Sequence, residues 1–139
     1  MVADDIRELL DKLCARRRRS YSSSLRPFNV YVGQDHALRE LWKGEGVTQS
    51  QLSERMGCEP LTVTNMIKKL EDNGLISRQR GGEDGRVSRV YLTSEGRALQ
   101  QPVQEVLRNE QEKMLDDILP EERLLLHRLL QQMVENISK

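Results

Sequence analysis

The fold is decided by residues 48–93, which read TQSQLSERMGCEPLTVTNMIKKLEDNGLISRQRGGEDGRVSRVYLT. Thr48 and Gln51 have the spacing of a capping box, in which each side chain bonds the backbone N–H of the other, so a helix is expected to begin here. Gly57 supplies the backbone freedom that a helix needs in order to end in a sharp turn. The pattern predicts a short helix over residues 49–56.

A second helix is expected to follow at once, because Glu59 is placed to cap it and Pro60 suits its first position, where no backbone N–H is needed. At about 100° per residue, one side of this helix is apolar and the other is mainly polar. The apolar side holds Val63, Met66, Ile67 and Leu70, and the outward side holds Leu61, Thr62, Asn65, Lys68 and Lys69. Two helices separated by about three or four residues that include a glycine have the spacing of a helix-turn-helix.

The outward side carries groups that can contact DNA in the major groove. Asn65 can pair with adenine through two hydrogen bonds, and hydroxyl and lysine side chains can reach base edges and phosphates. Two alternatives remain open at this point. Lys68, Lys69 and Arg78 can be an ordinary solvated surface, and the whole unit can be a winged-helix module that binds protein instead of DNA.

A β-hairpin, or wing, is expected after this helix, whose end is predicted as a left-handed cap at Asn73 and Gly74. Residues 75–80 and 86–92 are two extended runs separated by a segment rich in glycine. Arg86 follows Asp84 by two residues, a spacing at which the carboxylate can hold the guanidinium in a fixed orientation. Such an arginine suits a narrow, electronegative minor groove.

The chain resembles the MarR family of bacterial transcriptional regulators. The motifs that carry the resemblance are Thr48-Gln-Ser-Gln-Leu52, Leu61-Thr-Val-Thr-Asn65, Leu70-Glu-Asp-Asn-Gly-Leu-Ile76, Arg78, Asp84-Gly-Arg86 and Leu92-Thr-Ser-Glu-Gly96. They lie densely in the middle third of the chain, and the flanking helices match only in pattern and length. The resemblance implies a homodimer whose terminal helices interlock, with recognition helices in successive major grooves and wing arginines in the flanking minor grooves.

The same resemblance implies a set of DNA-contacting residues. By motif match these are Pro60, Leu61, Thr62, Thr64, Asn65 and Lys68 in the recognition helix, and Arg86 in the wing with Asp84 as its brace. Lys69 and Arg78 complete the predicted DNA-binding residues. The expected function is a repressor that binds double-stranded DNA at a pseudo-palindromic operator, with half-sites about one helical turn apart.

The rest of the chain predicts helices that bring two subunits together. One helix is expected to end near Leu25, before Pro27, and another to span residues 34–43. A further helix follows Thr93 as its cap and bends at Pro102. The last helix begins at Pro120, and its apolar sector is too broad for one neighbouring helix. The sector consists of Leu124, Leu125, Leu126, Leu129, Leu130, Met133, Val134 and Ile137. A monomer that folds this sector onto its own first helix is the alternative to a dimer.

The predicted fold class is therefore mainly α with a small β-hairpin wing. Residues 1–33 are the N-terminal dimerisation helix and linker, residues 34–93 the winged helix-turn-helix region, and residues 94–139 the C-terminal dimerisation helices. The 22 basic and 22 acidic side chains cancel, so nonspecific attraction to DNA is expected to be weak. No run of about 20 apolar residues and no signal-peptide core is present, which favours a cytoplasmic protein.

Catalysis and metal binding have little support in the sequence. The chain holds two cysteines and two histidines without the spacing of a zinc site, so neither a metal nor a cofactor is expected. No nucleophile–base order and no phosphate-binding glycine loop at a strand-to-helix turn is present, which favours a regulator over an enzyme.

Two hypotheses address the signal to which the protein responds. In the first, Arg17 lies in the middle of an otherwise apolar helix stripe and anchors a small anionic aromatic effector, with Tyr21, Tyr31 and His36 nearby; family members commonly bind such acids. The alternative for Arg17 is an ion pair with the other subunit, or a stem lying on apolar surface. In the second hypothesis, Cys14 senses peroxide, as a first-helix cysteine does in one branch of the family. That branch usually has a tyrosine one turn later, where this chain has Arg18, and a buried inert thiol fits equally well.

Overall fold

The computed structural model describes residues 1–81 and 85–138. Their elements run in the order α1 (Val2–Leu25), η1 (Arg26–Phe28), α2 (Gln34–Lys43), β1 (Val47–Thr48), α3 (Gln49–Met56), α4 (Pro60–Asp72), β2 (Ile76–Gly81), β3 (Val87–Leu92), α5 (Ser94–Ala98), α6 (Gln100–Met114) and α7 (Pro120–Ile137). The chain divides into two compact units, residues 1–107 and 108–139. The predicted class, mainly helical with a β-hairpin wing, is confirmed.

The helix-turn-helix forms where its sequence signals lie. The Thr48 hydroxyl accepts from the Gln51 N–H at 3.1 Å, and the Gln51 side chain accepts from the Thr48 N–H at 2.9 Å, which confirms the capping box at the start of α3. Gly57 then adopts a left-handed φ of 67° and ends the helix. The expectation for Glu59 is wrong: it precedes α4, but among the described contacts its side chain makes no capping hydrogen bond.

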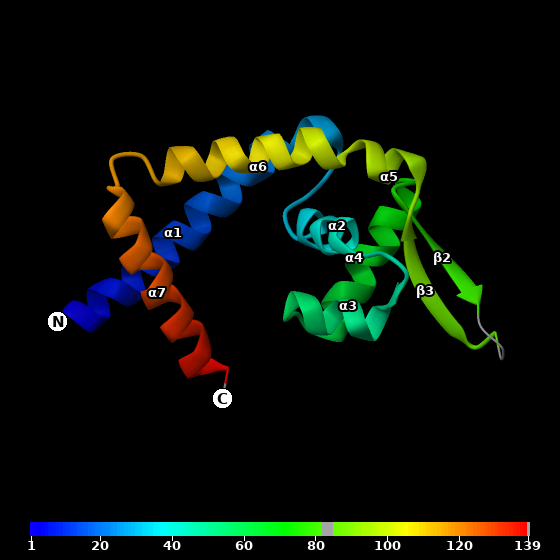
Figure 1. Ribbon diagram of the computed structural model, residues 1–139, viewed down its shortest axis with the longest axis horizontal. Coiled ribbons are helices and arrows are strands. Elements are labelled where there is room, and N and C mark those ends of the chain that lie inside the picture. The colour runs from blue at the N-terminus through cyan, green and yellow to red at the C-terminus, as the bar shows by residue number, and fades with distance from the viewer. Residues whose placement is uncertain (82–84, 139) are drawn as a thin grey trace. The chain divides into compact units, whose positions relative to one another are not determined.

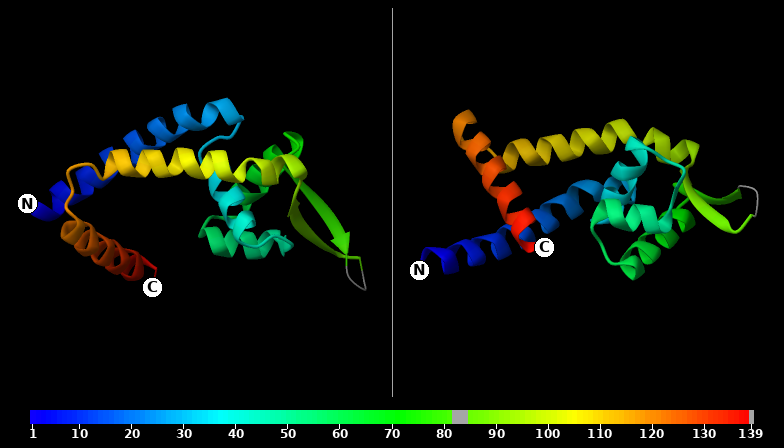
Figure 2. Two further views of the ribbon diagram at one scale, coloured as in Figure 1. Left: turned by 45° about the horizontal axis from the view of Figure 1, so that its top comes forward. Right: turned by 60° about the horizontal axis from the view of Figure 1, so that its bottom comes forward.

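The sheet contains one more strand than the hairpin predicted. Within the described residues its order is β1-β3-β2, with both pairings antiparallel. Val47 lies opposite Val90 in the short β1–β3 pair, and Arg78 also lies opposite Val90 in the longer β2–β3 pair. A strand of two residues has no periodicity that sequence analysis can detect. Figures 1 and 2 show the β2–β3 ribbon projecting away from helices α2 to α4.

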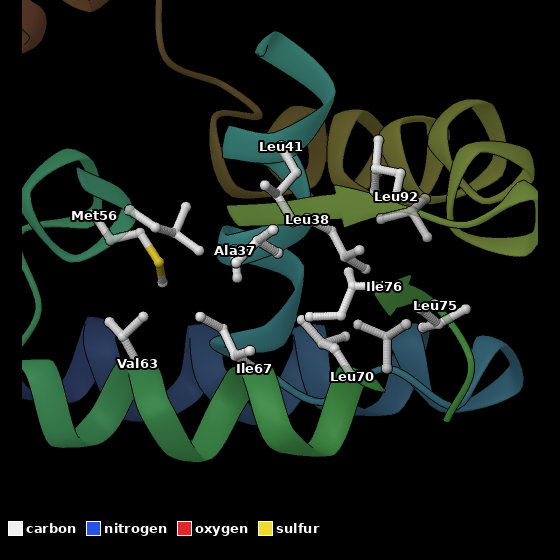
Figure 3. Close-up of a cluster of buried hydrophobic side chains, with 14 of the residues drawn as sticks. Ala37, Leu38, Leu41, Met56, Val63, Ile67, Leu70, Leu75, Ile76 and Leu92 are labelled. Atoms are coloured by element: carbon white, nitrogen blue, oxygen red, sulfur yellow. The ribbon is translucent and has the colours of Figure 1, made fainter. Parts of the chain in front are cut away.

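One apolar core holds α2, α4 and the sheet together. Figure 3 shows side chains of α4 directed toward those of α2 and the strand residues. The fully buried members from the two helices are Ala37, Leu38, Leu41, Val63, Ile67 and Leu70. Burying a side chain of this size contributes about 1.5–3 kcal/mol, so these contacts set which side of α4 faces outward. Residues 63, 67 and 70 repeat at helical spacing, as predicted.

Three backbone details differ from the predictions. At the end of α4 only Gly74 is left-handed, with a φ of 76°, whereas Asn73 has a φ of −84°. The helix expected after Thr93 is divided into α5 and α6, and Pro102 lies in the first turn of α6 instead of bending a longer helix. Proline cannot donate to the carbonyl four residues earlier and its ring crowds that carbonyl, so the interruption comes one turn before it. Ile118, which the apolar spacing places in the same predicted helix, lies beyond the end of α6.

The base of the wing is fixed by contacts from three elements. The Trp42 indole at the end of α2 donates to the Gly96 carbonyl in α5 at 3.0 Å. Arg89 in β3 donates to the Gly46 carbonyl at 3.2 Å, and the Glu45 carboxylate accepts from Arg97 at 2.9 Å. These contacts join β3 and α5 to the end of α2 and to the segment that follows it, so the ribbon starts from a defined position.

The terminal helices expose many apolar side chains. On α7 the exposed ones are Leu124, Leu125, Leu126, Leu129, Leu130, Val134 and Ile137, and on the first half of α1 they are Val2, Ile6, Leu9 and Leu13. In the second unit, Arg123 closes the connection before α7 by donating to the carbonyls of Leu115 and Ile118, each at 2.9 Å. None of the described helices is both long enough and apolar enough to cross a membrane.

Candidate nucleic-acid interface

Helix α4 presents to solvent most of the residues that the sequence predicted as DNA contacts. The exposed ones are Pro60, Leu61, Thr62, Asn65, Lys68 and Lys69. Leu61 is 72% exposed, so an apolar side chain is also available on this surface. The surface thus offers an amide, a hydroxyl, two ammonium groups and one apolar side chain along a single helix face.

Thr64 differs from the other predicted contacts on α4. It is only partly exposed, and its hydroxyl donates to the Pro60 carbonyl at 2.9 Å. The same hydroxyl accepts a hydrogen bond from the side-chain amide of Gln49, the first residue of α3. Sequence analysis did not select Gln49, because nothing in the sequence indicates that residues 15 positions apart on two helices meet.

Arg78 lies beside α4 and is paired with an acidic residue of that helix. Its guanidinium donates to Glu71 through two nitrogens, at 3.0 and 3.4 Å. The side-chain hydrogen bond from Arg78 lowers the pKa of the Glu71 carboxyl below its ordinary value, so the pair stays ionised at neutral pH. Arg78 therefore lies at this surface with its positive charge neutralised by the Glu71 carboxylate.

The wing carries a second line of basic residues. Arg80 lies opposite Ser88, two positions along from the Arg78–Val90 pair, so Arg78 and Arg80 share one face of the ribbon. Arg80 is exposed, and this alternation was the signal that sequence analysis passed over. Arg86 is also exposed, immediately before β3. The predicted brace, Asp84, lies outside the described residues.

The predicted effector residues have different surroundings. The Arg17 guanidinium lies 4.3 Å from the centre of the Tyr21 ring, so its partner is an aromatic ring one turn away on the same helix. Tyr21 itself is buried, whereas Tyr31 is 58% exposed. Burial, followed by the charge of Arg39, lowers the pKa of the His36 imidazole, which leaves it neutral at pH 7. Of the four residues, only Arg17 thus offers a positive charge to an anion.

Neither of the two cysteines forms a disulfide. Cys14 on α1 is exposed, and Cys58 in the turn between α3 and α4 is partly buried, with its thiol 3.7 Å from the Met56 carbonyl. The exposure of Cys14 differs from the buried inert thiol that is the alternative to a peroxide sensor, an alternative based on the neighbouring Leu10 and Leu13. In the single chain Leu13 is 46% exposed and Leu10 is partly buried.

Comparison with known proteins gives relatives of one kind. Residues 31–88 match the model of the MarR family. The chain is 32% identical over 102 residues to YwoH, an uncharacterized HTH-type transcriptional regulator of Bacillus subtilis, and the match covers 73% of this chain and 74% of YwoH. It is 33% identical over 98 residues to YdgJ of the same species, with coverage of 70% and 60%. It is 34% identical over 83 residues to the organic hydroperoxide resistance transcriptional regulator of that species, with coverage of 60% and 56%. The chain therefore spans less than two thirds of the length of the last two relatives.

Solved structures with the same fold extend this result. A MarR transcriptional regulator from Methanosarcina mazei Go1 has a TM-score of 0.85 at 26% identity, with 96% of each chain covered. A mutant MarR from E. coli in complex with operator DNA has a TM-score of 0.85 at 18% identity, with 94% of each chain covered. An organohalide-sensing regulator bound to 2,4-dichlorophenol has a TM-score of 0.91 at 19% identity, covering 98% of this chain and 81% of that one. The last two likenesses establish the fold, and every relative named here is a regulator rather than an enzyme.

Proposed function

This chain belongs to the MarR family, and we propose that it is a transcriptional repressor that binds a specific double-stranded DNA sequence as a homodimer. The observation that carries the proposal is the outward face of α4, where Asn65 and Lys68 are exposed beside a basic wing. The opposite face of the helix is held in the core by Val63, Ile67 and Leu70, so the polar face has a fixed direction.

The chemistry of this face fits the major groove. The Asn65 amide matches the donor and acceptor pair of adenine, and the exposed Leu61 side chain suits the thymine methyl group. Lys68 and Lys69 supply positive charge for phosphates, which orients the helix without specifying sequence. Arg86 enters the flanking minor groove, and its brace by Asp84 remains part of this proposal.

The homodimer is supported by apolar surface that one chain leaves exposed. Val134 and Ile137 on α7 are 61% and 86% exposed, and Leu9 on α1 is 63% exposed. Soluble monomers rarely expose continuous apolar stripes of this kind, because covering them with a second copy is favourable. A two-fold dimer presents two α4 helices, which matches an operator built as an inverted repeat.

The proposed DNA contacts can be tested with two alanine variants. Asn65→Ala should relax preference at one base pair of each half-site, by about 1–3 kcal/mol. Lys68→Ala should weaken binding to all sequences alike and reduce the slope of log affinity against log salt by about 1. Unchanged DNA affinity in both variants would instead support a protein-interaction module.

We propose release by a small anionic aromatic effector as the signal, with Arg17, Tyr31 and Tyr21 in the binding region and neutral His36 contributing a hydrogen bond. The exposed Arg17 guanidinium supplies the charge that such an anion requires. The effector would bind more tightly to the conformation that does not fit DNA. DNA affinity would then fall by the ratio of the effector's affinities for the two conformations. Arg17→Gln should abolish release by benzoate-class acids while leaving DNA affinity unchanged; undiminished release would contradict this assignment.

A second candidate signal is oxidation at Cys14. It is favoured by the exposure of this thiol and by the 34% identity to a hydroperoxide resistance regulator. Only accessible thiols that form thiolates react readily with peroxides. If peroxide releases DNA from the native protein but not from Cys14→Ser, this candidate is correct. Release from both rules out this cysteine as the sensor.

A further inference from the structure

Thr64 is engaged differently from the exposed residues of α4 that the family motif places against DNA. The predicted contacts Thr62, Asn65 and Lys68 are exposed, whereas the Thr64 side chain is held between its own helix and α3. This difference bears on how α4 is presented to DNA, and the inference that follows rests on the proposed DNA-binding function.

The hydroxyl of Thr64 has little hydrogen-bonding capacity left. A threonine hydroxyl has one proton to donate and two lone pairs that accept. The proton is donated to the Pro60 carbonyl at 2.9 Å, and one lone pair accepts from the Gln49 amide. Phosphates and most base edges in the major groove are acceptors, which need a donor from the protein. A hydroxyl whose proton is already committed cannot supply one.

Gln49 is in a fixed position from which to hold this hydroxyl. It follows Thr48 directly, and the Thr48–Gln51 capping box pins the first turn of α3. Its side chain crosses to α4 and joins Thr64, which in turn bonds to Pro60 at the start of that helix. The polar contacts therefore run from the first turn of α3 to the first turn of α4.

This bridge complements the apolar core. Val63 and Ile67 hold α4 from its buried side, where they contact the rest of the domain. The amide–hydroxyl contact restrains the same helix at a partly exposed edge between α3 and α4. Two restraints on different sides of a helix limit rotation about its axis more than one does.

We propose that Gln49 and Thr64 are a positioning pair that fixes the first turn of α4 for DNA binding, and that Thr64 does not itself recognise a base. The roles of Pro60 and Thr64 then differ from the motif expectation: the Pro60 carbonyl anchors the bridge, and base recognition falls to Thr62, Asn65 and the exposed Leu61. A side chain that only positions a helix affects all DNA sequences alike, whereas a base-contacting side chain affects one base pair.

The test is a double-mutant cycle on DNA affinity. Thr64→Val keeps the side-chain shape and removes the hydroxyl, Gln49→Ala removes the amide, and the third variant carries both. Each single variant should bind more weakly by up to about fivefold, because the contact exists before DNA binds and the loss is limited to its net contribution to fixing α4. The loss should be equal for the selected operator and for its single-base variants, and the double variant should bind no more weakly than either single one.

Matched controls separate this result from others. Thr64→Ser retains the hydroxyl and should bind as the native protein does. Thr62→Val combined with Gln49→Ala should show multiplied losses, because these two residues share no contact. Thermal unfolding of each variant checks that the fold is retained, and Thr64→Ser with Gln49→Ala suffices if Thr64→Val does not fold.

Two results would overturn the positioning pair. One is a change of preference at a single base pair in Thr64→Val that Gln49→Ala does not produce, and the other is a double variant whose losses multiply. Failure of the proposed function looks different, because the native protein would then select no DNA sequence and Asn65→Ala would change nothing.

Discussion

Replacing Glu71 with glutamine is expected to strengthen DNA binding, although it removes a residue that holds Arg78. In the native chain the guanidinium donates to the carboxylate at 3.0 and 3.4 Å, and both side chains are only about one third exposed. The pair therefore offers no net charge to a phosphate. Glu71→Gln removes the negative charge from the DNA-facing surface and releases Arg78 to contact one phosphate.

The size of the effect follows from counterion release. One additional phosphate contact steepens the slope of log affinity against log salt by about 0.9, which corresponds to about eightfold tighter binding at ~0.1 M salt. The cost in folding stability should stay below about 1 kcal/mol, because ion pairs at this exposure contribute little. Fluorescence anisotropy of labelled operator DNA at a series of salt concentrations measures both quantities.

The matched variants make the result decisive. Arg78→Gln leaves Glu71 uncompensated and should weaken binding, whereas the Glu71→Gln, Arg78→Gln double variant is again neutral and should return close to the native affinity. If Glu71→Gln binds as weakly as the native protein, with the same salt slope, then Arg78 does not lie near phosphate and the reasoning is refuted.

The same pair predicts a small pH dependence of stability. Hydrogen bonding to Arg78 lowers the pKa of Glu71 in the folded chain, so the folded state binds fewer protons than the unfolded state. Its contribution is therefore present above the ordinary glutamate pKa and is lost as pH falls below about 4. The native protein and Glu71→Gln should differ in unfolding free energy at pH 7, and the difference should shrink as the pH falls through the lowered pKa of Glu71, as urea unfolding can show.

Two further predictions concern stability and assembly. Gly96→Ala should destabilise the fold by about 3 kcal/mol in urea unfolding. The added Cβ would lie 2.1 Å from the Leu75 carbonyl oxygen, a backbone atom that cannot move aside easily. A loss under ~1 kcal/mol would mean that the sheet and α5 separate easily. Leu130→Glu should convert the dimer to monomer in sedimentation, while Arg128→Glu, on the opposite side of α7, should not; two unchanged dimers would place the subunit contact elsewhere.

Local sequence signals were sufficient for the helix-turn-helix. The Thr48–Gln51 spacing, Gly57 and Pro60 act within one or two turns, so each could be recognised without knowledge of the rest of the chain. The sequence did not predict β1, because this strand forms only through pairing with β3, about 40 residues later. The sequence predicted one helix bent at Pro102 instead of the separate α5 and α6, because the effect of the proline falls one turn before it.

The sequence predicted which residues lie at the candidate site. It did not predict which of their side chains are already paired with other residues of the chain. Helical spacing correctly placed Asn65 and Lys68 outward. The same spacing could not show that Glu71 occupies Arg78 or that Gln49 occupies Thr64, because both contacts join residues from separate elements. Motif matching assigns a residue to a surface, whereas the three-dimensional contacts decide whether its polar atoms remain available.

The most direct test of the account is selection of bound sequences from random duplex DNA by the native protein. Two symmetric copies of α4, each presenting Asn65, should enrich an inverted repeat whose half-sites are centred about one helical turn apart. Enrichment of a single unrepeated half-site would contradict the dimer, and recovery of no preferred sequence would contradict base recognition by the outward face of α4.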